Sequence, residues 1–131
     1  MDFGISGKTA AVAGGSAGLG LASAAALIEA GVRVAICGRN EARLHAAASA
    51  LGPQAVPIVA DVSTEAGAQA AVGEAIETLG SVEVLVNNAG GSLGSGTFEK
   101  ATAAQWREVL DLNLMAAVLS LIHISEPTRP Y

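Results

Sequence analysis

The residues best suited to chemistry form a glycine-rich stretch near the start of the chain, Ala13-Gly14-Gly15-Ser16-Ala17-Gly18-Leu19-Gly20. The stretch follows an apolar run and opens an Ala-rich segment with helical character. In that setting Gly14 permits a tight turn, Gly18 lets the backbone approach a pyrophosphate, and Gly20 lets helix and strand pack closely. It therefore predicts a dinucleotide phosphate site. The alternative, a glycine turn without a ligand, is disfavoured because a strand, a helix and a second strand frame the motif.

A second candidate contact, Gly38-Arg39-Asn40, closes the next apolar run. Dinucleotide folds use this position to recognise the adenosine ribose. An acidic residue there accepts hydrogen bonds from the 2′-hydroxyl of NAD, whereas an arginine forms charge-assisted hydrogen bonds with the 2′-phosphate of NADP. Arg39 therefore favours NADP(H) over NAD(H). The alternative is a solvated surface arginine beside Glu41.

Four short apolar runs position these motifs. None of them alternates polar with apolar residues, so each indicates a strand buried on both faces, as a parallel sheet requires. The runs are TAAVAG (9–14), RVAIC (33–37), AVPIVA (55–60) and VEVLVNN (82–88).

Helical segments separate the runs and follow the last one. The expected helices are Leu19 to Ala30, Glu41 to Leu51 after the N-cap Asn40, Glu65 to Leu79 after Ser63-Thr64, and a fourth beginning at Thr102. Thr102 and Gln105 form a capping-box pattern, and Gly80 ends the third helix. Strands joined by single helices are parallel with right-handed crossovers. The predicted fold class is therefore α/β, a Rossmann-type doubly wound parallel sheet, of which the chain holds four strands.

The glycine spacing GxxxGxG resembles the short-chain dehydrogenase/reductase family, whose usual form is TGxxxGxG. Ala13 stands where the family has Thr. Three further matches follow in order. Asp61-Val62 resembles the pair that contacts the adenine ring, Asn87-Asn88-Ala89-Gly90 is similar to the family's NNAG, and Asn113 matches its active-site asparagine. The resemblance covers Gly7 to about Val118.

This resemblance implies an oxidoreductase that moves a hydride between a nicotinamide cofactor and a carbonyl or secondary alcohol. The loop after NNAG resembles that of 3-oxoacyl carrier-protein reductases, and an intact relative is expected to be a homo-oligomer. Some NADP-using members carry a second basic residue in the glycine loop, and this sequence has Ala17 there instead. The catalytic candidate is Asn113, and the candidate cofactor contacts are Gly14, Ser16, Gly18, Leu19, Gly20, Arg39, Asn40, Asp61, Val62, Asn87, Ala89 and Gly90.

The residues that the family uses for proton transfer are missing. The resemblance implies a Ser that polarises the carbonyl, a Tyr as general acid or base, and a Lys that lowers the pKa of that Tyr in a YxxxK spacing. The sole tyrosine is Tyr131, and the lysines are Lys8 and Lys100. We therefore expect an inactive fragment. The alternatives are a non-catalytic dinucleotide-binding module and, less favoured because its spacing is TGxxGxxG, a nucleotide-sugar epimerase.

The pattern changes in the last stretch, LSLIHISEPTRPY (119–131). Its β-branched residues and two prolines predict that the fourth helix ends near Val118. Leu119 to Arg129 also resembles a translated adapter from DNA library preparation. We expect a partial dinucleotide-binding domain over 1–118 and a non-native tail over 119–131; the alternative is a genuine, divergent C-terminus. Such a domain would leave the strand at 82–88 as an apolar sheet edge.

Composition excludes several function classes. The net charge of −5 argues against a nucleic-acid binder that coats phosphates. Cys37 is the only cysteine, so no internal disulfide is possible. The first residues lack the pattern of a signal peptide, and the longest weakly polar window, Leu19 to Ala30, is too short to span a bilayer. We expect a cytoplasmic protein without a membrane segment.

The remaining reactive side chains indicate structure and not chemistry. Cys37 lies within an apolar strand and is expected in the core. His45 and His123 are isolated, so no metal site is predicted. Ser92 and Ser95 occupy the GGSLGSG loop with no base at a recognisable spacing.

Overall fold

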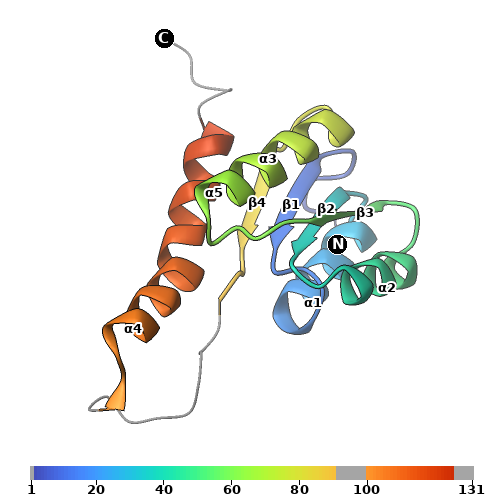
Figure 1. Ribbon diagram of the computed structural model, residues 1–131. Helices are drawn as coiled ribbons and strands as arrows, with labels where there is room; N and C mark the ends of the chain where they lie inside the picture. Colours follow the sequence, from blue (N-terminus) through green and yellow to red (C-terminus); the bar gives the residue numbers. More distant parts are fainter. Residues whose placement is uncertain (1, 91–99, 126–131) are drawn as a thin grey trace.

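Four strands form one parallel sheet in the computed structural model of the chain, which describes residues 2–90 and 100–125. The strands are β1 (Thr9–Ala13), β2 (Arg33–Gly38), β3 (Ala55–Val59) and β4 (Val84–Asn87). Their order is β3-β2-β1-β4, so the direction of winding reverses at β1 (Figure 1). All four predicted runs are confirmed as strands, with ends shifted by one or two residues, and the doubly wound parallel sheet is confirmed.

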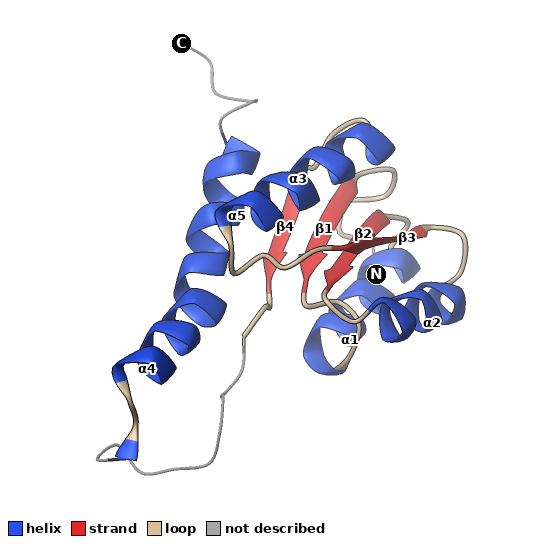
Figure 2. Cartoon of the chain, viewed as in Figure 1, coloured by secondary structure: helices blue, strands red, loops and turns tan. Residues whose placement is uncertain are grey.

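Helices cover both faces of this sheet (Figure 2). One face carries α1 (Gly18–Glu29) and α2 (Glu41–Leu51). The other carries α3 (Glu65–Leu79) and α5 (Ala116–Ser125). Before α5 in the chain come α4 (Ala103–Leu110) and a π-helical turn, η2 (Asp111–Met115), and the three segments form one continuous helix (Figure 1). None of the helices in these ranges combines the length and the apolar character that a bilayer crossing requires.

The core consists of two apolar clusters, because successive strand residues point to opposite faces of a sheet. Ala11 and Ala35 face the α3 and α5 side, whereas Val12 and Ile36 face the α1 and α2 side. Ile36, Leu44 and Val12 are fully buried. Burial on both faces explains why the strands contain no alternating polar residues. Pro57 is tolerated in β3 because that strand lies at the edge of the sheet.

Three of the predicted helix starts are confirmed by side-chain hydrogen bonds. The Asn40 side chain accepts from the Arg43 N–H at 3.0 Å, and the Thr64 hydroxyl accepts from the Gly67 N–H at 3.0 Å. At α4, Thr102 and Gln105 form both bonds of the predicted capping box, 3.2 and 2.9 Å long. Each cap satisfies first-turn N–H groups that have no acceptor within their own helix.

The prediction that the fourth helix ends near Val118 is wrong, since α5 extends to Ser125. Ala116 and Ser120 are buried at 1% and 3% exposure, and Leu119 packs against the cluster that contains α3. This tertiary burial outweighs the low helix propensity of β-branched residues. Residues 126–131, the loop with Ser92 and Ser95, and the side chain of His123 lie outside the described residues.

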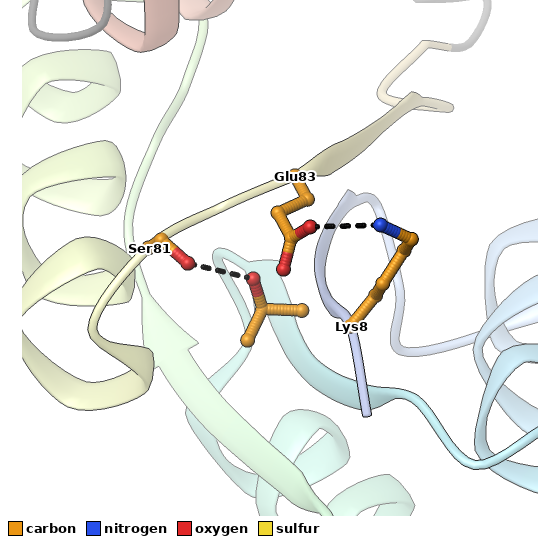
Figure 3. Close-up of polar contacts among 4 residues, drawn as sticks. Lys8, Ser81 and Glu83 are labelled. Atoms are coloured by element: carbon orange, nitrogen blue, oxygen red, sulfur yellow. Dashed lines mark hydrogen bonds and ion pairs between the residues drawn. The ribbon is translucent and has the colours of Figure 1, made fainter. Parts of the chain in front are cut away.

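Three polar contacts align the start of β4 with β1. The Lys8 ammonium lies 3.1 Å from a Glu83 carboxylate oxygen, and Ser81 lies nearby (Figure 3). The Ser81 and Thr9 hydroxyls are 3.3 Å apart, and the Glu83 N–H donates to the Thr9 carbonyl at 3.0 Å. The exposed ion pair contributes at most about 1 kcal/mol. Its main effect is register, because it fixes which residues of β4 reach the opposite end of the sheet.

Candidate functional site

A cleft of about 460 Å³ opens at the carboxyl ends of the strands, where the strand order reverses. Open α/β sheets bind ligands at this topological switch point. Every strand contributes its C-terminal residues or the loop that follows it, and η2 closes one side. The lining residues are Gly14, Ser16, Cys37, Gly38, Arg39, Asn40, Arg43, Ala60, Asp61, Val62, Ala89, Gly90 and Leu112.

Most of the candidate cofactor contacts from the sequence meet in this cleft. The eight that line it are Gly14, Ser16, Arg39, Asn40, Asp61, Val62, Ala89 and Gly90. Gly18, Leu19 and Gly20 instead form the first turn of α1, just beyond Ser16. Asn87 lies at the end of β4, paired in register with Ala13, and does not line the cleft.

The glycine loop is packed tightly against the neighbouring strand ends. The N–H groups of Gly14 and Gly15 both donate to the Cys37 carbonyl, at 2.9 and 3.1 Å. Gly14 has φ 76, and a Cβ there would lie 2.9 Å from the Asn88 carbonyl oxygen. A Cβ on Gly20 would overlap the carbonyl oxygen of Gly14. Both positions therefore require glycine, as the motif predicts.

The N-terminus of α1 differs from the other helix starts because it has no side-chain cap. Ala17 occupies the N-cap position in an extended conformation, φ −159 and ψ 167, and has no side-chain acceptor. The first helical bond is from the Leu21 N–H to the Ala17 carbonyl. Within the described residues, the N–H groups of Gly18, Leu19 and Gly20 have no hydrogen-bond acceptor. A helix start with unsatisfied donors and a positive dipole end is suited to an anion.

Asp61 lies across the cleft from the glycine loop and is held as a carboxylate. Its Oδ1 accepts hydrogen bonds from the Ser63 hydroxyl at 2.6 Å and from the Ser63 N–H at 3.0 Å. The hydroxyl bond is the main reason that the pKa of Asp61 lies below its ordinary value, and the Arg39 guanidinium lowers it further. Arg39 and Asp61 therefore influence each other across one part of the cleft.

Asn113 lies in the π-helical turn η2, beside the end of β4. Its side-chain amide donates to the Val109 carbonyl at 2.9 Å. A Cβ on Gly90 would lie 2.6 Å from Asn113 Oδ1, so the NNAG segment and this asparagine touch. Single π turns are frequent at functional sites, where they reposition a side chain within a helix. The predicted catalytic residue thus sits at the edge of the predicted cofactor site, next to Leu112.

Cys37 is part of the cleft wall but is not a reactive group. Only 5% of the residue is exposed, and burial raises the pKa of its thiol to about 12. A protonated thiol is a poor nucleophile at neutral pH. The sequence prediction of a core cysteine is confirmed. The described residues hold no group of three or more His, Cys, Asp or Glu side chains able to bind a metal ion.

Sequence reasoning missed four lining residues, Cys37, Arg43, Ala60 and Leu112, whereas Gly38 belongs to the candidate segment Gly38-Arg39-Asn40. Arg43 is the charged one. It lies three residues after the N-cap Asn40, on the first turn of α2. That spacing was available in the sequence, since a helix that starts at a strand's carboxyl end brings its first turn to the same edge of the sheet. Leu112 had no comparable signal, because its place depends on the π turn.

The fold and the cleft together define a Rossmann-type nucleotide-binding domain. The family model described as short chain dehydrogenase matches residues 8–126, and the chain belongs to this oxidoreductase family. A similar relative is the rhamnolipids biosynthesis 3-oxoacyl-[acyl-carrier-protein] reductase of Pseudomonas aeruginosa. It is 39% identical over 116 residues, which are 86% of this chain and 44% of that protein.

Solved structures agree with this assignment. L-sorbose reductase from Gluconobacter frateurii, complexed with NADPH and L-sorbose, aligns with a TM-score of 0.89 at 35% identity, over 96% of this chain and 49% of that one. The 3-ketoacyl-(acyl-carrier-protein) reductase of Brucella melitensis, complexed with NADH, aligns with a TM-score of 0.87 at 29% identity, over 95% and 52%. The chain therefore spans about half the length of the relatives that it matches.

Proposed function

We propose that this chain binds NADP(H) in the cleft and forms the cofactor-binding part of an oxidoreductase acting on a carbonyl or secondary alcohol. One observation carries the proposal: the uncapped start of α1 opens beside the same cleft that holds Arg39 and Asp61. Phosphate donors and adenosine-recognising side chains thus lie together at the switch point of the sheet.

The residues present fit a dinucleotide. The N–H groups of the first turn of α1, around Gly18 and Leu19, would hold the pyrophosphate. Among the described residues outside this turn, no atom lies within 4 Å of a Cβ built on Gly18. Asp61 and Val62 would contact the adenine, and Arg39 and Asn40 the ribose. Ala89 and Gly90 would line the path toward the nicotinamide, and Ser16, Gly20 and Asn87 would support the loop and strand ends.

The preference for NADP(H) rests on Arg39. An arginine at the end of β2 supplies donors for a 2′-phosphate, whereas NAD recognition uses an acidic acceptor there. Replacing Arg39 with Asp is expected to weaken NADP⁺ binding relative to NAD⁺ binding by at least about tenfold, as the loss of a hydrogen bond to a charged group implies. An unchanged ratio of the two dissociation constants would contradict the preference.

The chemistry of the whole protein is a further part of the proposal. When bound, the nicotinamide ring supplies or accepts the hydride. Asn113 would hold a proton-relay water beside Gly90, while this sequence contains no YxxxK pair and no residue that matches the family's catalytic serine. We therefore propose that this chain alone binds cofactor without turnover and that the intact enzyme reduces 3-oxoacyl-type substrates, as the name of the Pseudomonas relative suggests.

Three expectations about the protein's setting remain proposals. We propose a cytoplasmic location, a homo-oligomeric intact protein and a non-native stretch over 119–131. Exposed apolar side chains along α4, η2 and α5 support association, among them Leu110 and Leu114, which are 47% and 55% exposed. Sedimentation of the intact protein tests the second proposal, and sequencing the parent gene beyond the codon for Val118 tests the third.

The central test is calorimetric titration of NADP⁺ into the 131-residue chain. We expect saturable binding with a dissociation constant below about 1 mM, the range in which enzymes hold such ligands. No detectable binding by a folded chain would refute the proposal. Turnover of a 3-oxoacyl thioester by this chain would refute only its inactivity. Binding by an intact parent that lacks activity would favour the alternative, a non-catalytic module.

A further inference from the structure

Arg43 lines the cleft alongside Arg39, although it belongs to a different element. Arg39 follows β2, and Arg43 lies in the first turn of α2. Both residues are exposed, so their guanidinium groups are accessible to a ligand. Two arginines therefore border one part of a cleft whose other polar wall is Asp61.

The local structure fixes the backbone position of Arg43. Its N–H donates to Asn40 Oδ1 at 3.0 Å, which ties the first turn of α2 to the end of β2. The next residue, Leu44, is fully buried, and its Cδ1 would lie 3.5 Å from a Cβ on Gly38. The first turn is thus anchored from both sides. Arg43 therefore stays at the edge of the cleft although its guanidinium group forms no hydrogen bond or ion pair within the described residues.

The charge of Arg43 is not compensated by the described residues. The ion pairs there join Lys8 to Glu83 and Glu41 to His45. Arg39 already faces an acid, since it helps to lower the pKa of Asp61. A single arginine that shares its charge with a carboxylate is a weak site for a doubly charged phosphate. An accessible second arginine that lines the same cleft supplies the additional positive charge.

We propose that Arg43 is a specificity residue that, together with Arg39, holds the 2′-phosphate on the adenosine ribose. This inference rests on the proposed cofactor binding. Two guanidinium groups on different elements can each direct planar, paired donors at the phosphate oxygens. They supply the second positive charge that Ala17 does not provide in the glycine loop.

The test uses two adenosine fragments, so that no residue beyond this chain is needed. Adenosine 2′,5′-bisphosphate and 5′-AMP are titrated into the full 131-residue chain and into Arg43→Gln. We expect the variant to bind the bisphosphate about 10- to 100-fold more weakly, the loss expected for a hydrogen bond to a charged group, with 5′-AMP unchanged. Arg43→Lys retains the positive charge but not the paired planar donors of the guanidinium group, so its affinity for the bisphosphate should fall between those of the unmodified chain and Arg43→Gln.

Arg33→Gln is the matched control, because it removes the same charge from an exposed arginine that does not line the cleft. Arg33 lies at the opposite end of β2, where its guanidinium donates to the Thr78 carbonyl at 3.5 Å. It should leave the preference for the bisphosphate over 5′-AMP unchanged. Circular dichroism melts of all three variants verify that they fold.

The outcomes separate the two proposals. Suppose that the unmodified chain binds 5′-AMP and NADP⁺, and that Arg43→Gln and Arg43→Lys both prefer the bisphosphate over 5′-AMP as strongly as the unmodified chain does. The role of Arg43 is then refuted and the cofactor proposal stands. An equal loss for both fragments also refutes it, because the effect is then not specific to the 2′-phosphate. Failure of the folded, unmodified chain to bind any of these ligands refutes the proposed function itself.

Discussion

Replacing Ala17 with Asp should make the chain more stable and a poorer binder of dinucleotide. Ala17 is exposed and already has the extended conformation that N-cap residues adopt, yet it offers no acceptor to the first turn of α1. A carboxylate there can accept from those N–H groups. Exchanging Ala for Asp at an N-cap contributes about 1 kcal/mol, and the favourable helix dipole acts in the same direction.

The expected shift in melting temperature follows from the size of the chain. Unfolding entropy is about 2.1 cal/mol/K per residue. For 131 residues this is about 0.28 kcal/mol/K, so 1 kcal/mol raises the midpoint by about 4 °C. The same carboxylate occupies the donors proposed for the pyrophosphate and places a like charge beside it, which together should weaken NADP⁺ binding at least about tenfold.

Thermal melts and calorimetric titrations measure the two effects, and Ala17→Asn is the control. Asparagine caps about as well as aspartate and matches its shape, but it carries no charge. It should give most of the gain in stability, without the contribution of the charge to the helix dipole, and a smaller loss of affinity. A stabilised Ala17→Asp chain that binds NADP⁺ normally would show that the phosphates do not sit at this helix. An unchanged midpoint would show that the first-turn donors are already satisfied.

Three further predictions concern the glycine loop, the cleft wall and Asp61. Gly20→Ala should lower the free energy of unfolding by about 1–3 kcal/mol, because the new Cβ meets the Gly14 carbonyl. Gly73→Ala, which has open space around it inside α3, should raise the free energy of unfolding by about 0.5–1 kcal/mol. Urea melts measure both changes. Cys37 should resist alkylation near pH 8 until urea unfolds the chain, which mass spectrometry can follow; rapid native labelling would contradict its burial and its pKa of about 12. Because the folded pKa of Asp61 is lowered, its contribution to stability should be present near neutral pH and lost on acidification below about pH 4. Ser63→Ala should raise the pKa of Asp61 and reduce this loss of stability. An unchanged titration of the Asp61 carboxyl by NMR would count against the Ser63 hydrogen bond.

The strands and helix starts were predictable because local sequence determines them. Short apolar runs rich in Val, Ile and Ala and bounded by turn residues indicate strands buried on both faces. Asn40, Thr64 and Thr102 carry their capping oxygens in their own side chains. The parallel pairing of the strands was also predictable, because single helices join successive strands. The glycine spacing likewise indicated two positions at which the structure leaves no room for a Cβ, Gly14 and Gly20.

Features that depend on tertiary packing were not predictable in this way. The continuation of α5 to Ser125 follows from burial of Ala116 and Ser120, which no local propensity reveals. The π turn around Asn113 places Leu112 in the cleft, and no periodicity indicates it. Arg43 lies on the first turn of α2, and its approach to the cleft depends on how that helix packs at the end of β2.

The pairing of β1 with β4 has a consequence for how the chain is made. Ala10 pairs with Val34 on one side and with Val84 on the other, so the second partner emerges from the ribosome long after the first. Contacts so distant along the chain form slowly, and domains begin to assemble from the N-terminus during synthesis. The β1–β2–β3 unit can therefore fold while β4 is still being translated. Because Ala89 and Gly90 complete the cleft wall, a nascent chain becomes able to capture its nucleotide only after β4 has docked.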